Sequence, residues 1–176
     1  MATHDDATTD LGKKLAEEKR AYAGDEERPL EGYVAAMATF GAFAAVVVMA
    51  AASRRKDAPE HFALMDIGLT GVATHKITRI LTKDSVTSPL RAPFTRYKEP
   101  GGPAEVMEDV RGSGVKHAVG ELITCPFCLS PWVATALTGG LVIAPRFTRA
   151  VTAVFSAVAL SDHLQLTYAK QQQAAE

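Results

Sequence analysis

Residues 120–132 read Gly120-Glu121-Leu122-Ile123-Thr124-Cys125-Pro126-Phe127-Cys128-Leu129-Ser130-Pro131-Trp132, and they contain both cysteines and the only tryptophan of the chain. They follow a polar segment rich in proline and glycine and lead into an apolar run that ends at Ala144, before Pro145 and Arg146. An apolar run of this length after a polar loop is typical of a helix that enters a bilayer. We therefore expect the cysteines to lie at a membrane surface, where a helix begins.

Polar and apolar residues are unevenly divided along the 176 residues. Residues 1–29 and most of 83–124 are polar and charged, whereas four segments are apolar enough to suggest helices that cross a membrane. We predict an all-α integral membrane protein with about four transmembrane helices and a cytoplasmic loop between the second and third. The predicted units are an arm (1–29), a first helix (30–53), a helical membrane domain (59–169) with helices at about 61–82, 127–145 and 148–168 and a loop at 83–124, and a tail (170–176).

The first two predicted helices differ in their apolar pattern. Tyr33–Ala52 has no charged residue and is long enough for about 30 Å of helix. The second helix contains charges, but a helical projection gathers its polar residues on one face and most of its apolar residues on the other. The polar face is Thr70, Gly71, Thr74, His75, Thr78, Arg79 and Thr82, and the apolar face is Met65, Leu69, Val72, Ala73, Ile77 and Ile80. We expect it to span the membrane; an amphipathic helix on the membrane surface is the alternative.

The polar segments carry weaker signals. We expect the arm to be solvated and partly disordered, with a short helix from Thr9 or Asp10 to Ala23, ended by Gly24, as the alternative. In the loop we predict a short helix near Ala104–Val110 and an amphipathic helix over Val115–Thr124.

Charge and cysteine content exclude several classes of protein. A net charge of −1 argues against a nucleic-acid partner, which needs a clustered basic face. Two cysteines three positions apart cannot form the disulfide framework of a secreted domain, and the acidic N-terminus does not resemble a cleavable signal peptide. Lysine and arginine are more numerous in the arm, loop and tail than in the other two connections, which predicts that both termini are cytoplasmic.

This topology brings ionisable residues from separate helices to one depth. The predicted cluster is His75, Arg79, Glu121, Asp162 and His163, beside the cysteines. Ionisable groups inside a membrane domain usually find partners, and we predict an Arg79–Asp162 contact. Such a cluster serves either a functional site or a polar clamp that fixes the helix register, and we favour the clamp.

The Cys125-x-x-Cys128 pair supports three interpretations. It is a candidate redox pair, since two such thiols can exchange disulfides. It also supplies half of a zinc site, which His117 would extend and His75 or His163 would complete. In the third interpretation the two reduced thiols pack as small apolar groups under Trp132. We expect no resident cofactor other than this possible zinc ion.

Two motifs together resemble a known family. The first is Thr74-His75-Lys76-Ile77-Thr78-Arg79-Ile80-Leu81 followed by Asp84, Val86-Thr87 and Pro89-Leu90-Arg91-Ala92-Pro93-Phe94, and the second is residues 120–128 with Trp132-Val133. In this order and spacing they resemble the uncharacterised bacterial membrane family DUF1360, over about Leu64–Ala169. The resemblance implies a bacterial inner-membrane protein with a cytoplasmic loop. It implies no activity, and the arm and first helix are additions to it.

Three functions remain open at this point. We favour a non-enzymatic subunit or scaffold in the bilayer, whose cytoplasmic loop contacts another membrane or cytoplasmic protein or a second copy of the chain. This choice rests on the lack of a nucleophile–base set, a phosphate-binding loop or a complete metal site in the sequence. The alternatives are a membrane thiol–disulfide oxidoreductase that uses Cys125 and Cys128, and a small transporter or channel formed by an oligomer.

Overall fold

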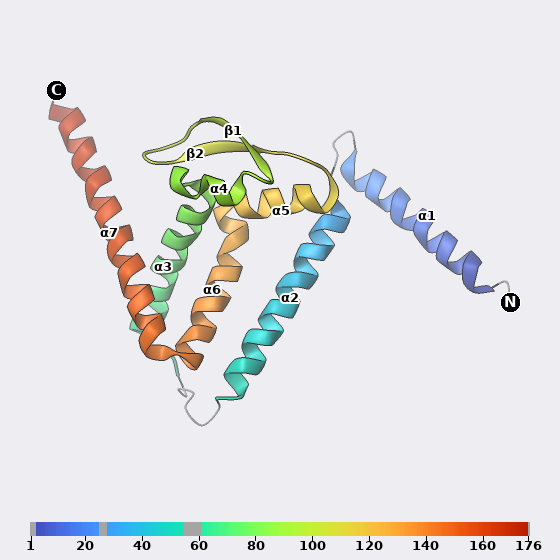
Figure 1. Cartoon of the computed structure of the whole chain (residues 1–176), viewed down its shortest axis with the longest axis horizontal. Helices are drawn as coiled ribbons and strands as arrows, with labels where there is room; N and C mark the ends of the chain where they lie inside the picture. Colours follow the sequence, from blue (N-terminus) through green and yellow to red (C-terminus); the bar gives the residue numbers. More distant parts are fainter. Residues whose placement is uncertain (1–2, 25–27, 55–60, 176) are drawn as a thin grey trace.

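Helices make up most of the computed structural model, which describes residues 3–24, 28–54 and 61–175. Four long helices lie side by side: α2 (Leu30–Ala52), α3 (Leu64–Lys83), α6 (Pro126–Ile143) and α7 (Pro145–Ala175). We call them the helix bundle. One end of the bundle carries η1 (Ser85–Thr87), α4 (Ser88–Arg91), β1 (Thr95–Pro100), β2 (Val106–Val110) and α5 (Gly114–Thr124), which together form the cap (Figure 1).

The arm is helical in its described part. Helix α1 runs over Thr3–Ala23 and ends at Gly24, whose φ of +57° suits a glycine after the last helical turn. The favoured prediction of a partly disordered arm is therefore wrong for these residues, and the helical alternative is confirmed with an earlier start. Residues 1, 2 and 25–27 of the predicted arm, residues 59 and 60 of the predicted domain, and residue 176 of the tail lie outside the described residues.

Two helices, α2 and α6, are long and apolar enough to cross a membrane. They pack through aromatic rings and a close backbone approach. Trp132 of α6 lies edge-on to Phe40 and stacked on Phe43 of α2, with ring centroids 5.2 and 5.7 Å away. A Cβ atom added at Gly139 of α6 would lie 2.1 Å from Cγ1 of Val47, so the glycine permits this contact.

The bundle buries hydroxyl groups and exposes large apolar side chains. Helix α3 packs on α6 and α7, and its buried residues are Thr70, Ala73, Thr74, Thr78 and Thr82. Helix α7 buries Thr148, Thr152 and Ser156, and the Ser156 hydroxyl donates to the carbonyl of Leu69 at 3.0 Å. Exposed apolar residues include Met37, Val46 and Met49 on α2, Leu64, Met65 and Ile67 on α3, and Val154, Leu160 and Leu164 on α7.

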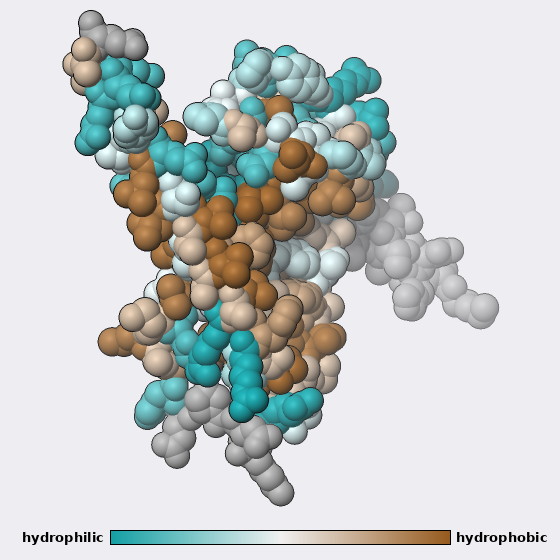
Figure 2. All heavy atoms as spheres, turned by 60° about the vertical axis from the view of Figure 1, so that its left-hand side comes forward, coloured by the Kyte–Doolittle hydropathy of each residue, from teal (hydrophilic) through white to brown (hydrophobic). Residues whose placement is uncertain are grey.

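On the face of the molecule shown in Figure 2, apolar side chains form a belt between two hydrophilic ends. The threonines of α3 face protein, as the helical projection predicted. Ala73 is fully buried, although the projection placed it on the apolar face, and Gly71 and His75 of the polar face are exposed.

The cap corrects the prediction of an all-α fold. Strands β1 and β2 form an antiparallel hairpin in which Thr95 pairs with Val110 and Pro100 with Val106, with an irregularity between Tyr97 and Glu99. The helix predicted near Ala104–Val110 is wrong, because most of that segment is β2. Helix α5 agrees with the predicted amphipathic helix and packs against both α2 and β2. Its Gly120 lies so close to Val110 that an added Cβ would be 2.5 Å from Cγ1 of that valine.

Helix α7 is longer than predicted. It continues through the expected tail to Ala175, and its 31 residues correspond to about 46 Å of helix. The upper part of α7 therefore rises beside the cap (Figure 1).

Candidate functional site

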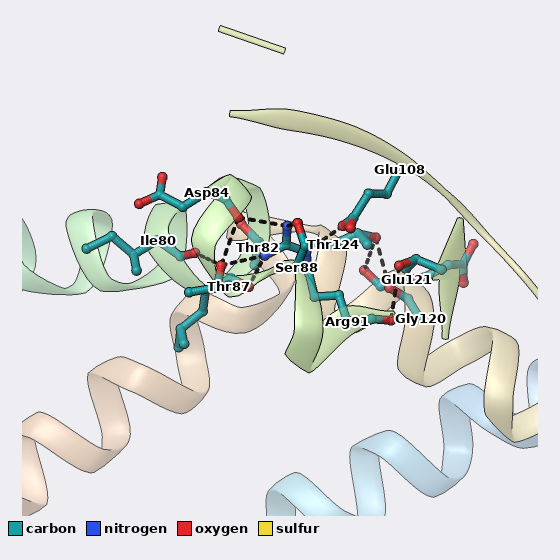
Figure 3. A network of polar contacts seen from close by, with 12 residues as sticks. Ile80, Thr82, Asp84, Thr87, Ser88, Arg91, Glu108, Gly120, Glu121 and Thr124 are labelled. Carbon is teal, nitrogen blue, oxygen red and sulfur yellow. Dashed lines mark hydrogen bonds and ion pairs between the residues drawn. The ribbon is translucent and has the colours of Figure 1, made fainter. Parts of the chain in front are cut away.

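Arg91 holds the cap onto the end of α3. Its side chain is 1% exposed and forms an ion pair with Glu108 of β2, which is 5% exposed. Its guanidinium donates to the carbonyls of Leu81 and Asp84, each at 2.9 Å, and to the Thr87 hydroxyl at 2.6 Å (Figure 3). Thr87 in turn donates to the carbonyl of Ile80 at 2.5 Å.

These contacts occupy carbonyl groups that the last turn of α3 leaves without a helical partner. They also place a positive charge at the helix C-terminus, where the helix dipole favours it. The clamp of Arg91, Thr87 and Glu108 thus joins α3, α4 and β2, and it makes the cap a folded element instead of the loop that we expected.

A charged pocket lies between α3, α7 and the turn of the hairpin. Its volume is about 610 Å³, and its lining includes four of the five residues of the predicted cluster: His75, Arg79, Asp162 and His163. We call it the charged pocket. The fifth residue, Glu121, lies on α5 in a different pocket.

Arg79 and Asp162, for which we predicted a contact, both line the charged pocket, but each forms its ion pair with another residue. Arg79 instead contacts both carboxylate oxygens of Glu105 at 2.5 Å. Asp162 pairs with Lys76 at 2.6 Å, and the Lys76 side chain is only 15% exposed. The two pairs tie α3 to the hairpin and to α7, so they hold three walls of the pocket together.

The cysteines line a second, mostly apolar pocket of about 570 Å³ between α2, α5 and the start of α6. We call it the thiol pocket. The Sγ atoms of Cys125 and Cys128 are 2.6 Å apart, and both thiols are free. Cys125 precedes the first turn of α6, and its Sγ accepts the backbone N–H of Cys128 at 3.2 Å.

Glu121 is the carboxylate of the thiol pocket. Its Oε2 accepts a hydrogen bond from the Tyr33 hydroxyl at 2.6 Å, and its Oε1 lies 3.5 Å from Nε2 of His117 and 3.9 Å from Arg28. A carboxylate with these partners anchors α5 to α2.

The structure does not assemble the predicted zinc site. His117 points Nδ1 to the carbonyl of Gly112 at 3.1 Å and Nε2 towards Glu121. Within residues 3–24, 28–54 and 61–175, no group of three or more His, Cys, Asp or Glu side chains is arranged to hold a metal ion. His117, Cys125 and Cys128 therefore do not form a ligand set in this conformation.

Sequence reasoning missed Lys76, Arg91, Glu105 and Glu108 as members of these networks. Arg91 and Thr87 belong to a motif quoted above, but the sequence did not indicate that they join the cap to α3. Glu105 and Glu108 stand in a segment that we predicted as loop and short helix, and only the hairpin brings them to α3 and α4.

Comparison with known proteins identifies the family of this chain. It belongs to the family described as "Protein of unknown function (DUF1360)", whose model matches residues 69–168. It is similar to the sporulation protein YjcA of Bacillus subtilis (strain 168), with 33% identity over 73 residues that cover 40% of this chain and 62% of the relative's length. No solved structure matches. Both pockets thus draw residues from the matched range, whereas the α2 wall of the thiol pocket lies outside it.

Proposed function

We propose that this chain is a small multi-pass protein of a bacterial inner membrane, in which α2, α3, α6 and α7 span the bilayer and the cap is cytoplasmic. The support is the burial pattern of the bundle, with hydroxyl groups inside and large apolar side chains outside. In lipid there is no hydrophobic driving force between helices, so small and hydroxyl-bearing residues serve the contacts and apolar residues face outward. In water the same exposed apolar area would favour aggregation.

Its function in this proposal is non-enzymatic: the cap is a docking surface for a protein partner on the cytoplasmic side. The observation that carries this is the Arg91 clamp, which makes the cap a preformed surface that loses little entropy on binding. The cap also exposes large side chains to the aqueous side, among them Leu90 (64% exposed) and Tyr97 (65% exposed). The relative from Bacillus is named for sporulation, which is a process and not a chemistry, and a docking role is compatible with it.

Site-specific photo-crosslinking in living cells tests the docking role. A photoreactive amino acid at Leu90 or Tyr97 is expected to give a discrete protein adduct. The matched control is Phe147, which is 71% exposed at the opposite end of the bundle. Adducts from Phe147 alone, or from none of the three positions, would contradict a docking cap.

A second function, thiol–disulfide exchange, is favoured by the 2.6 Å separation of the cysteine sulfurs. In that reaction a disulfide of a partner is reduced to two thiols, while Cys125 and Cys128 each lose a proton and an electron and form a disulfide. Thiol trapping in cells tests it: a Cys125–Cys128 disulfide in the wild type, and a mixed disulfide trapped by one of the single Cys→Ser variants, would support it. Fully reduced thiols after an oxidant challenge, with no trapped species, would leave the pair as packed apolar groups.

The channel alternative loses its main support. That alternative used the threonine and histidine face of the second predicted helix to line a pore between copies of the chain. His75 of this face is exposed, but Thr70, Thr74, Thr78 and Thr82 are buried within one chain.

A further inference from the structure

The charged pocket presents charges of both signs at short range. Lys76 and Arg79 supply two positive charges, which are paired with the carboxylates of Asp162 and Glu105, and Asp84 supplies a third carboxylate. A simple anion would meet three carboxylates, and a simple cation would meet an ammonium and a guanidinium. A ligand with a positive and a negative group a few bonds apart satisfies both sets.

One side of the charged pocket is apolar. Helix α7 contributes Ala159, Leu166 and Ala169 on the same face as Asp162 and His163, as the spacing of three and four residues requires. One turn further into the bundle, the corresponding side chains are Val72 of α3 and Val158 of α7, and both are exposed. The pocket therefore opens next to exposed apolar side chains of α3 and α7.

The third wall is a turn with strained backbone. Ala104 has a φ of +62°, a backbone conformation that is unfavourable for a residue with a Cβ atom. Its carbonyl accepts the N–H of Ser85 at 3.0 Å, and the N–H of Gly101 donates to the carbonyl of Glu105 at 2.8 Å. These bonds hold the turn, and with it Glu105, in place over the pocket before any ligand arrives.

We infer that the charged pocket binds the headgroup of a phospholipid that carries a primary amine. Its phosphate would meet Lys76 and Arg79, its ammonium would meet the carboxylates of Glu105 and Asp162, and its acyl chains would lie along the exposed apolar residues of α3 and α7. The recognised chemistry is a phosphate joined to a primary ammonium, which a soluble phosphoamine shares. We assign the membrane lipid as its source because the pocket opens next to these exposed apolar side chains. The inference rests on the proposed membrane location.

Native mass spectrometry of the purified full-length chain tests this. The chain, in mild detergent, is offered equal amounts of phosphatidylethanolamine and phosphatidylcholine with identical acyl chains. The quaternary ammonium of the second lipid has no N–H group to donate to a carboxylate. Charge-assisted hydrogen bonds are stronger than those between neutral groups. We therefore expect about ten times as much bound phosphatidylethanolamine as bound phosphatidylcholine. Equal retention of the two lipids overturns the inference without any variant.

Variants locate the binding. Asp162→Asn and Glu105→Gln are each expected to remove most of the preference, whereas Asp109→Asn, in the exposed ion pair with Lys98 on the same hairpin, is expected to keep it. If both pocket variants elute and melt like the wild type and keep the preference, the site lies elsewhere and the inference fails. Free phosphoethanolamine that competes as well as the intact lipid at equal concentration overturns the lipid as source.

The failure of this inference is distinguishable from that of the membrane proposal. Extraction of host membranes with alkaline carbonate is done first. Release of the chain into the supernatant contradicts the membrane location itself. Retention in the membrane followed by equal binding of the two lipids contradicts the lipid site alone.

Discussion

The cap and the helix bundle bury different polar groups: the cap buries an ion pair, and the bundle buries hydroxyl groups. At the centre of the cap lies an ion pair between Arg91 and Glu108, both almost fully buried and surrounded by hydrogen bonds. The bundle buries threonines and glycines, while its large apolar residues face outward, as Leu64 does with 87% exposure. The cap buries charge, whereas the bundle exposes large apolar side chains. One surrounding solvent would not favour both patterns. The difference is what two solvents would produce, water around the cap and lipid around the bundle, and the following variants test how far it holds.

The largest effect is expected for Arg91→Met. It leaves Glu108 buried without its charge partner and removes donors from the end of α3. Removing one partner of a buried pair costs about 3–5 kcal/mol. Hydrogen exchange of β1 and β2 should rise towards that of an unfolded segment, while α6 stays protected. Arg96→Met, on the exposed side of β1, is the control and should leave exchange unchanged. Equal protection in both variants would contradict the clamp.

The double variant Arg91→Met with Glu108→Leu sharpens this prediction. Replacing a buried ion pair by apolar residues is often close to neutral, because no charge is left without a partner. We expect the double variant to recover most of the protection of the hairpin. If the hairpin exchanges hydrogen as fast in the double variant as in Arg91→Met, the hydrogen bonds of Arg91 to Leu81 and Asp84 stabilise the cap more than its ion pair does.

The next effect is expected for Gly139→Leu in the bundle. The added side chain has no space against Val47, so α2 must move away from α6, at a cost of about 1–3 kcal/mol. The thermal midpoint of the chain in detergent should fall. Gly41→Leu on α2 has open space around the added atoms and is the control. A fall of the same size in the control would mean that any large residue disturbs α2, wherever it points.

A smaller effect with the opposite sign is expected for Thr74→Val. The Thr74 hydroxyl is buried and has no hydrogen-bond partner among the residues that the structure describes, so its removal should be neutral or stabilise by up to about 1 kcal/mol. Thr78→Val removes a hydroxyl that donates to the carbonyl of Thr74 at 2.8 Å, and it should not stabilise. Midpoints measured side by side decide this, and a clear loss for Thr74→Val would point to a partner such as water at that site.

The smallest effect is expected for Arg149→Gln. Arg149 contacts Asp66 at the end of the bundle away from the cap, and more than half of its side chain is exposed. The Asp66 side chain is 12% exposed, but the exposed guanidinium keeps the pair open to water and salt, which weaken it. The midpoint should be indistinguishable from that of the wild type at high salt. If Arg149→Gln lowered the thermal midpoint as much as Arg91→Met does, the buried pair of the cap would not be more important for stability than this ion pair.

The helix bundle was predictable because its signal is local. Apolar runs and breaks at Gly, Pro and charged residues placed α2, α3, α6 and the start of α7 close to the observed ranges. The hairpin was not predictable in the same way. Strand β1 contains a proline and three charged residues, and β2 has only five residues, so neither shows a clear alternation of apolar and polar positions.

The candidate site was predictable only in part, for the same reason. The depth of His75, Arg79, Asp162 and His163 follows from where each helix begins and ends. The partners do not, because Arg79 finds Glu105 on a hairpin that the sequence did not indicate, and Lys76 lies closer to Asp162. Glu121 was grouped with this cluster, but α5 runs across the bundle and carries it to the thiol pocket.

Accessibility of two introduced cysteines tests the central claim most directly. In a Cys125→Ser/Cys128→Ser background, Arg96→Cys marks the cap and Arg146→Cys marks the turn between α6 and α7. Both positions are exposed. Bacterial protoplasts that express either variant are treated with a membrane-impermeant maleimide before and after lysis. The account predicts labelling of Arg146→Cys in intact protoplasts, and of Arg96→Cys only after lysis. The same accessibility for both positions would contradict a bundle that spans the membrane, and the reverse order would place the cap outside.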